Sequence, residues 1–140
     1  MGYAISRIDS VYGSSADEGF LVGAPGYAAS ANAPATGGVY IVYDAGTSSP
    51  SYALSSMIFS GEQDGEEFGA SVSSVGDIDG DNYDDFIVGA PMWDSDSAGV
   101  AISNAGRALL YSGTAAENGN TPLCEIVAPD GEANDYFGYK

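Results

Sequence analysis

Five carboxylates are crowded into nine residues near the middle of the chain: Asp77, Asp79, Asp81, Asp84 and Asp85. No Lys, Arg or His occurs between Arg7 and Arg107 to balance them. Carboxylates this close raise each other's pKa unless a cation lies among them. The run therefore predicts a surface loop that is either a solvated acidic turn or a site where a hard cation takes oxygen ligands.

The spacing of the loop favours the cation, and calcium in particular. Counted from Asp77 as position 1, the loop has Asn82 at position 6 and Val88 at position 12. An EF-hand loop needs glycine and glutamate at these positions, so an EF-hand is excluded. Gly80 and Asn82 lie between ligand positions, where tight turns use residues that tolerate positive φ. Asp84 falls outside the alternation and is expected to be solvated. The candidate calcium ligands, at loop positions 1, 3, 5, 7 and 9, are Asp77, Asp79, Asp81, the backbone carbonyl of Tyr83, and Asp85.

Both flanks of the loop are typical of β-strands. Residues 86–88 form an aromatic and β-branched run that stops at the Gly-Ala-Pro of residues 89–91. Residues 68–76 alternate small, polar and apolar side chains on the other side. The sequence therefore predicts a hairpin whose turn is closed by metal.

These elements together resemble the FG-GAP repeat of integrin alpha-subunit β-propellers: Phe68-Gly69, then the acidic loop 77–85, then the Gly-Ala-Pro of residues 89–91. The resemblance implies an all-β fold in which each repeat is one four-stranded antiparallel sheet of a propeller. It also implies structural calcium in the hairpin between the first two strands, and adhesion or protein recognition instead of catalysis.

A long internal repeat supports this interpretation. Residues 20–25 recur as residues 86–91, 66 positions later, and residues 38–43 recur as 106–111, 68 positions later. The latter pair is predicted to form third strands. We divide the chain into a first repeat, 1–67, a second repeat with the calcium loop, 68–136, and the start of a third, 137–140.

The first repeat departs from the metal pattern. Its equivalent loop, residues 9–19, is one residue longer and lacks the alternating aspartates. We expect no calcium there and solvated Asp17 and Glu18, with a weak site between Asp9 and one of them left open.

Two repeats raise the question of closure, because propellers close with typically four to eight blades. The alternatives are a segment of a longer parent chain, a ring of copies such as a trimer or tetramer, or end blades covered by another protein.

Composition limits the partners. A net charge of −17 with three basic residues argues against nucleic acid, and no apolar run reaches membrane-spanning length. The expected partners are a protein ligand or copies of the chain. No signal peptide is visible, but calcium loops of this kind suit an extracellular or cell-surface location.

Catalysis finds little support. The chain has no histidine, and its one cysteine, Cys124, lies in a predicted fourth strand and is expected to be buried. A rival hypothesis makes Asp94 and Asp96 an acid–base pair for glycoside hydrolysis, in the long connection 92–105, where Trp93 is expected to fold back over the blade edge. Two further alternatives are a self-assembling architectural scaffold and a non-catalytic accessory propeller of a secreted hydrolase.

Overall fold

The computed structural model describes residues 3–10, 18–44, 52–97, 100–114, 121–128 and 132–140. In this part of the chain the strands form two four-stranded sheets and one two-stranded sheet, and every strand pair is antiparallel. The same residues contain no helix long and apolar enough to span a membrane. The expected all-β architecture of four-stranded antiparallel sheets is confirmed.

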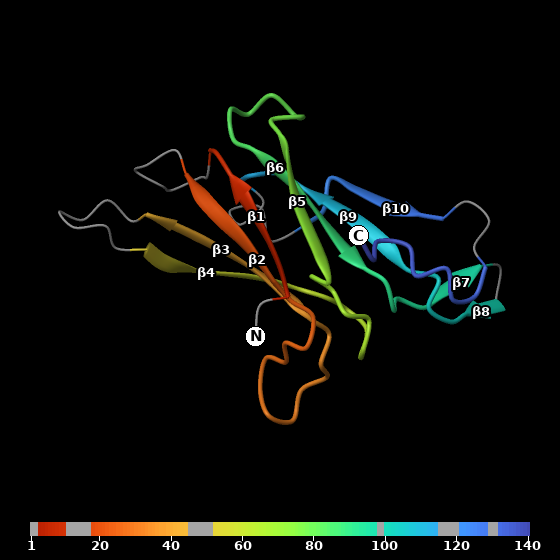
Figure 1. Cartoon of the computed structure of the whole chain (residues 1–140). Helices are drawn as coiled ribbons and strands as arrows, with labels where there is room; N and C mark the ends of the chain where they lie inside the picture. The colour runs from red at the N-terminus through yellow and green to blue at the C-terminus, as the bar shows by residue number, and fades with distance from the viewer. Residues whose placement is uncertain (1–2, 11–17, 45–51, 98–99, 115–120, 129–131) are drawn as a thin grey trace.

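The first large sheet is a continuous meander, and the second is a meander with one hairpin inserted between its second and third strands (Figure 1). The first has the order β1-β2-β3-β4, with β1 at Ala4–Ile8, β2 at Gly19–Ala24, β3 at Gly38–Asp44 and β4 at Tyr52–Ser60. The second has the order β5-β6-β9-β10, with β5 at Ser71–Gly76, β6 at Asp85–Ala90, β9 at Arg107–Tyr111 and β10 at Cys124–Val127. Strands β2 and β6 both end at the alanine that precedes a proline, because proline cannot donate to the ladder.

The connection from β6 to β9 contains a hairpin that was not predicted from the sequence. Its strands are β7, at Ser95–Ser97, and β8, at Val100–Ile102. Three residues per strand are too few to show a period-2 pattern, and serine and aspartate favour turns instead of strands.

The core lies between the two large sheets, where β1 packs against β5. Phe59 of β4 is edge-to-face with Phe86 and with Tyr111, with ring centroids 5.1 and 5.0 Å apart, and Phe86 stacks on Tyr111 with centroids 5.6 Å apart. Burial raises the pKa of Tyr111 to about 12. Phe68, the phenylalanine of the Phe-Gly pair, is fully buried against Tyr111. One aromatic cluster therefore joins the two sheets.

Glycines allow a repeated close approach of backbones. A Cβ on Gly23 would overlap the carbonyl oxygen of Gly69, and a Cβ on Gly89 would overlap that of Gly138. Gly69 and Gly138 also have φ values of +89° and +85°, which L side chains rarely adopt. The Gly-Ala-Pro glycine of each large sheet thus contacts the Phe-Gly glycine that follows that sheet.

Strand pairing corrects the alignment of the third strands by one position. Phe68 bridges Gly37, and Phe137 bridges Gly106, so Gly106 corresponds to Gly37 and the spacing is 69, not 68. The sequence misled because Gly37 and Gly38 are adjacent and either one can be matched to Gly106. The correction matters because a one-residue slip turns every side chain of a strand to the other face.

Candidate metal centre

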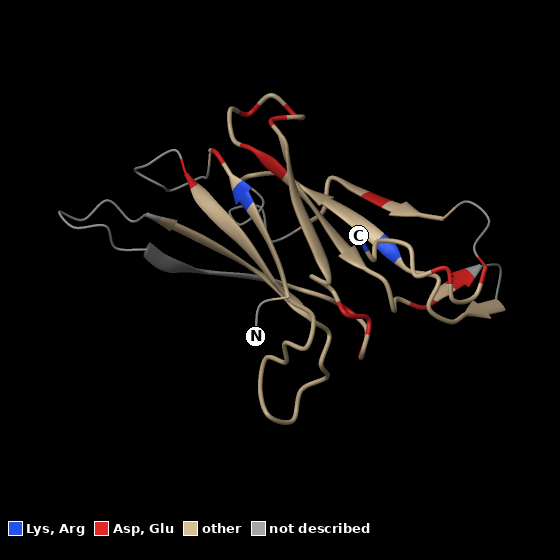
Figure 2. Cartoon of the chain, in the orientation of Figure 1, with Lys and Arg blue, Asp and Glu red and all other residues tan. Residues whose placement is uncertain are grey.

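The candidate centre is the loop between β5 and β6. The pairing of β5 with β6 shifts register between Ser74 and Gly76 and ends at Gly76, which has a φ of +75°. Gly80 and Asn82 also have positive φ, at +85° and +70°, as expected for the positions between ligands. The loop lies at one end of the second sheet, where the ribbon in Figure 2 is coloured for several acidic residues.

Asp77 organises the turn from inside. Its Oδ1 accepts hydrogen bonds from the backbone N–H of Gly80, at 2.6 Å, and of Asp81, at 3.2 Å. Its Oδ2 accepts from the N–H of Asn82 at 3.0 Å. The loop is therefore wrapped around the first aspartate by its own backbone.

Asp85 closes the loop from the strand side. Its side chain is fully buried, and its Oδ2 accepts from the N–H of Ile78 at 2.8 Å and of Asp79 at 3.2 Å. Its Oδ1 accepts from the N–H of Gly113 at 3.0 Å. A buried carboxylate needs such donors or a cation.

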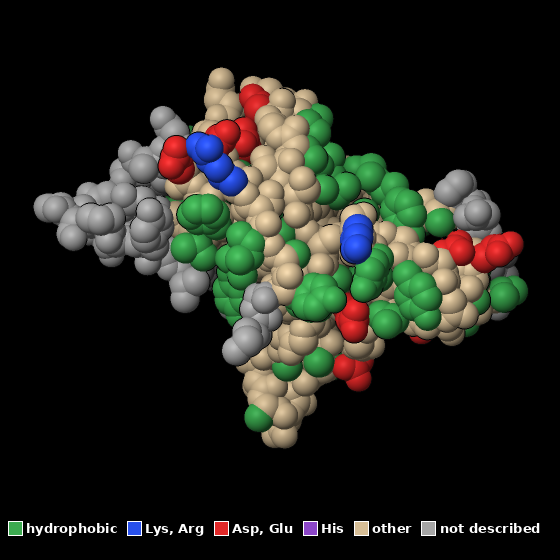
Figure 3. Space-filling view, in the orientation of Figure 1, with side chains coloured by type: hydrophobic (Ala, Val, Ile, Leu, Met, Phe, Trp, Pro, Cys, Tyr) green, Lys and Arg blue, Asp and Glu red, His purple; other side chains and the backbone are tan. Residues whose placement is uncertain are grey.

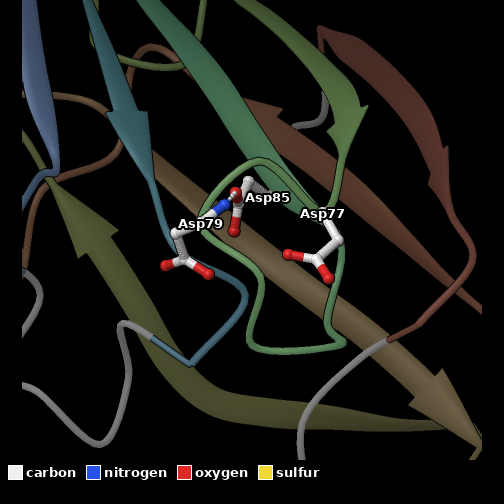
Figure 4. A group of neighbouring side chains, drawn as sticks. All are labelled: Asp77, Asp79 and Asp85. Atoms are coloured by element: carbon white, nitrogen blue, oxygen red, sulfur yellow. Dashed lines mark hydrogen bonds between the residues drawn. The ribbon is translucent and has the colours of Figure 1, made fainter.

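Three of the predicted ligands come together. Carboxylate oxygens of Asp77, Asp79 and Asp85 all lie within 4.8 Å of one another, and this is the one such group of three found in the described residues (Figure 4). Asp77 and Asp79 are exposed, whereas Asp85 is buried. The result is a set of hard oxygen donors, open on one side, of the kind calcium takes.

Asp81 lies outside this group. Its Oδ2 accepts from the hydroxyls of Ser112 and Thr114, both at 2.9 Å, and its Oδ1 accepts from the N–H of Tyr83 at 2.9 Å. Burial alone would raise the pKa of Asp81, but these hydrogen bonds lower it below the ordinary value. The roles of Asp81 and of the Tyr83 carbonyl as ligands stay predictions.

The segment after β9 is a part of the site that sequence reasoning missed. The contacts with the loop come from Ser112, Gly113 and Thr114, which lie about 30 residues further along the chain than the aspartates they bind. A glycine after each third strand was visible in the sequence, at Gly46 and Gly113. Nothing local to the loop pointed to Ser112 or Thr114.

The expectation that Asp84 is solvated is wrong. Its Oδ2 accepts from the N–H of Asp9, at 3.0 Å, and from the hydroxyl of Ser74, at 3.2 Å. Its own N–H donates to the carbonyl oxygen of Ser10 at 3.0 Å. The alternation places Asp84 on the outer side of the loop, but that side faces the first sheet and Asp84 is only partly exposed.

Comparison with known proteins agrees with this geometry. The family model described as the FG-GAP repeat matches residues 68–111, which include β5, the acidic loop, β6 and β9. These residues are an FG-GAP repeat. The chain is also 33% identical over 102 residues to integrin alpha-PS2 of Drosophila melanogaster. The aligned region makes up 71% of this chain and 7% of that protein.

The equivalent loop of the first sheet lies largely outside the described residues, including Asp17. Of its ends, Asp9 and Glu18 both pair with Arg7, at 2.7 and 2.8 Å. Arg7 therefore pairs with two of the three carboxylates that a weak site could use, and the third, Asp17, lies outside the described residues. Among the described residues of the FG-GAP loop, by contrast, no aspartate pairs with Arg or Lys.

A charge cluster with a buried centre lies at the opposite end of the FG-GAP sheet. Arg107, at the start of β9, binds Glu66 at 2.9 Å, Glu125 at 3.1 Å and Glu62 at 3.3 Å. Its guanidinium also lies 4.9 Å from the ring centroid of Trp93, which is partly buried against the core. Trp93 therefore folds back as expected, but it packs on the core and on Arg107 of the inner strand β9 instead of covering the blade edge.

Two further expectations concern single residues. Cys124 is exposed, so the prediction of a buried cysteine is wrong: β10 is an edge strand, and all four of its residues are exposed. The Oδ1 of Asp94 accepts from the N–H of Asn104, its own N–H donates to the Gln63 side chain, and its carbonyl accepts from that side chain. Asp94 thus links the β6–β9 connection to the β4–β5 connection, which contains Gln63.

Proposed function

We propose that this chain is a calcium-stabilised part of an extracellular or cell-surface β-propeller that serves cell adhesion or protein–protein recognition. The observation that carries the proposal is the group formed by Asp77, Asp79 and Asp85 in the loop of an FG-GAP repeat. Its three carboxylates offer hard oxygen ligands to calcium. In this role the metal is structural, because it closes a hairpin at the end of a sheet.

The donor set fits calcium because three carboxylates lie close together and one of them, Asp85, is fully buried. Backbone N–H groups bind the Asp85 oxygens, but they do not cancel the repulsion between the three charges. Bound calcium would neutralise this repulsion. Asp77, Asp79 and Asp85 would hold the ion, and we propose Asp81 and the carbonyl of Tyr83 as the remaining protein ligands.

The two large sheets are proposed to be consecutive propeller blades. With the corrected register, the buried face of the second sheet, which carries Phe86 and Val88, corresponds to Phe20 and Val22 of the first. Phe20 is 43% exposed, and neighbouring Ile5 is 70% exposed. The outer face of the first sheet therefore has the residue pattern of a face that packs against another blade, and Figure 3 shows hydrophobic side chains on this side of the molecule.

The second sheet offers the complementary face. Leu21 and Ile41, which are buried in the first sheet, correspond to Ile87 and Leu110, which are partly exposed. The two sheets bury one interface between them. The outer face of each sheet carries the residues that correspond to the buried face of the other sheet. We propose that blades of the same kind cover both faces, either from a longer parent protein or from copies of the chain.

The experiment that tests the calcium role is thermal unfolding in calcium and in EDTA. At calcium 100-fold above its Kd, binding stabilises the folded state by about 2.7 kcal/mol. We expect this gain in the wild type and in Glu132→Gln, a control at an exposed carboxylate outside the loop, but not in Asp79→Ala. Identical wild-type melting curves in calcium and EDTA would contradict the proposal.

Light scattering with and without calcium tests the source of the neighbouring blades. A discrete trimer or tetramer that loosens on chelation indicates a ring of copies. A monomer or irregular aggregate indicates that the neighbours belong to a longer protein. A stable monomer that binds no hydrophobic dye would contradict the presence of two open blade faces.

A further inference from the structure

The outer side of the FG-GAP loop is bonded to the first sheet. Two hydrogen bonds join Asp84 to the segment after β1, one from the N–H of Asp9 to the carboxylate and one from the N–H of Asp84 to the carbonyl of Ser10. A third runs from the hydroxyl of Ser10 to the carbonyl oxygen of Asn82, at 3.1 Å. Residues more than 70 positions apart in the chain are thus tied together.

These bonds continue the packing of β1 on β5. The hydroxyl of Ser6, on β1, accepts from the N–H of Ser74 at 3.2 Å, and Ile8 at the end of β1 is 1% exposed. The Ser74 hydroxyl donates to Asp84 at 3.2 Å. The contact between the sheets therefore leads directly into the return arm of the loop, residues 82–84.

The return arm precedes the buried carboxylate of the candidate metal centre. Asp85 follows Asp84 directly, so fixing the backbone at Asn82 and Asp84 restricts the path by which the chain reaches Asp85. Ordering a loop before a ligand binds removes part of the entropy cost of binding. Asp84 is suited to this role because it binds the first sheet and is not one of the three grouped carboxylates.

We propose that Asp84 is a positioning residue that couples calcium binding in the FG-GAP loop to the docking of the first sheet against the second. The inference rests on the proposed calcium site. Coupling of this kind is reciprocal: if docking raises calcium affinity by some factor, calcium strengthens docking by the same factor. The ion then stiffens the contact between neighbouring sheets as well as its own hairpin.

Calcium titration calorimetry on the full chain tests the coupling. Each hydrogen bond contributes about 1 kcal/mol, or about fivefold in affinity. Ser10→Ala removes one bond without changing charge and should weaken calcium binding about threefold to fivefold. Asp84→Ala should weaken it about tenfold or more, while Asp84→Asn, which keeps an acceptor oxygen, should recover much of the loss.

The matched control is Ser73→Ala, on the same strand as Ser74 but bonded only to its own neighbour's carbonyl among the contacts described. It should leave calcium affinity unchanged. A second readout is hydrogen exchange at the amides of Asp9 and Asp84, which calcium should slow in the wild type and not in Ser10→Ala. A merely structural role would lower stability in the variants without moving either quantity.

The outcomes separate the two proposals. If the wild type binds no calcium, the proposed metal site fails and the coupling fails with it. If the wild type binds calcium but folded Ser10→Ala and Asp84→Ala bind it equally well, the coupling alone is overturned. Should Asp84→Ala not fold, Ser10→Ala and Asp84→Asn decide the question in the same way.

Discussion

Removal of the Arg107 side chain should destabilise the protein through the carboxylate it leaves behind. The Arg107 side chain is 5% exposed and binds Glu66, whose side chain is fully buried. The other two partners, Glu62 and Glu125, are 77% and 44% exposed, so each of those pairs contributes at most about 1 kcal/mol. Breaking a buried pair by removing one partner costs about 3–5 kcal/mol. We expect a loss of that size in Arg107→Met at pH 7, dominated by Glu66.

The stability lost in Arg107→Met should depend on pH, in a direction set by the pKa of Glu66. Burial raises the pKa of Glu66 above its ordinary value of 4.5, while Arg107 lowers it, so removing Arg107 raises that pKa further. A carboxyl whose pKa is raised by folding binds its proton more tightly in the folded state. Its stabilising contribution is therefore complete below pH 4.5 and is lost as the pH rises through the folded-state pKa.

Urea unfolding at pH 5 and pH 7 measures both effects. Arg107→Met should lose less stability at pH 5 than at pH 7, relative to wild type at the same pH. The double variant Glu66→Gln, Arg107→Met should be more stable at pH 7 than Arg107→Met alone, because no charge remains buried without a partner. An equal loss at both pH values, or a double variant no more stable than the single one, would refute the reasoning.

Two further substitutions test the packing between the sheets. Phe86→Ala should cost about 3–5 kcal/mol in urea unfolding, because the ring is fully buried between Phe59 and Tyr111; a loss below about 1 kcal/mol would show that the aromatic cluster does not hold the sheets together. Gly69→Ala should prevent stable folding, because its Cβ would overlap the carbonyl oxygen of Gly38. The control Gly65→Ala has a similar positive φ but nothing within 4 Å of the added Cβ, and it should cost only about 1–2 kcal/mol. Circular dichroism melts compare the two, and equal losses would mean that the close approach is unimportant.

Much of the fold could be predicted because local patterns carried it. The Phe-Ile-Val and Gly-Ala-Pro of residues 86–91 set the position and the end of β6, and the alternating aspartates indicated the loop before it. The third-strand register was missed by one residue because two adjacent glycines gave no local way to choose between them. The bridges to Phe68 and Phe137, and the positive φ that Gly37 shares with Gly106, distinguish Gly37 from Gly38.

The parts of the site that could not be predicted depend on contacts between distant segments. The loop sequence alone predicts a solvated Asp84, yet its partners Asp9 and Ser10 come from the segment after β1 of the first sheet. A cysteine in a strand predicts a buried side chain, yet Cys124 is exposed because β10 lies at the edge of its sheet. Burial of both residues is decided by the position of neighbouring strands, which the local sequence does not specify.

The most direct test of the central claim is the stoichiometry of calcium binding by titration calorimetry. The account predicts that the wild-type chain binds one calcium ion in the FG-GAP loop and that Asp77→Asn abolishes this binding while Glu132→Gln preserves it. A wild-type chain that takes up no calcium, or an Asp77→Asn variant that binds it as tightly as wild type, would contradict the account.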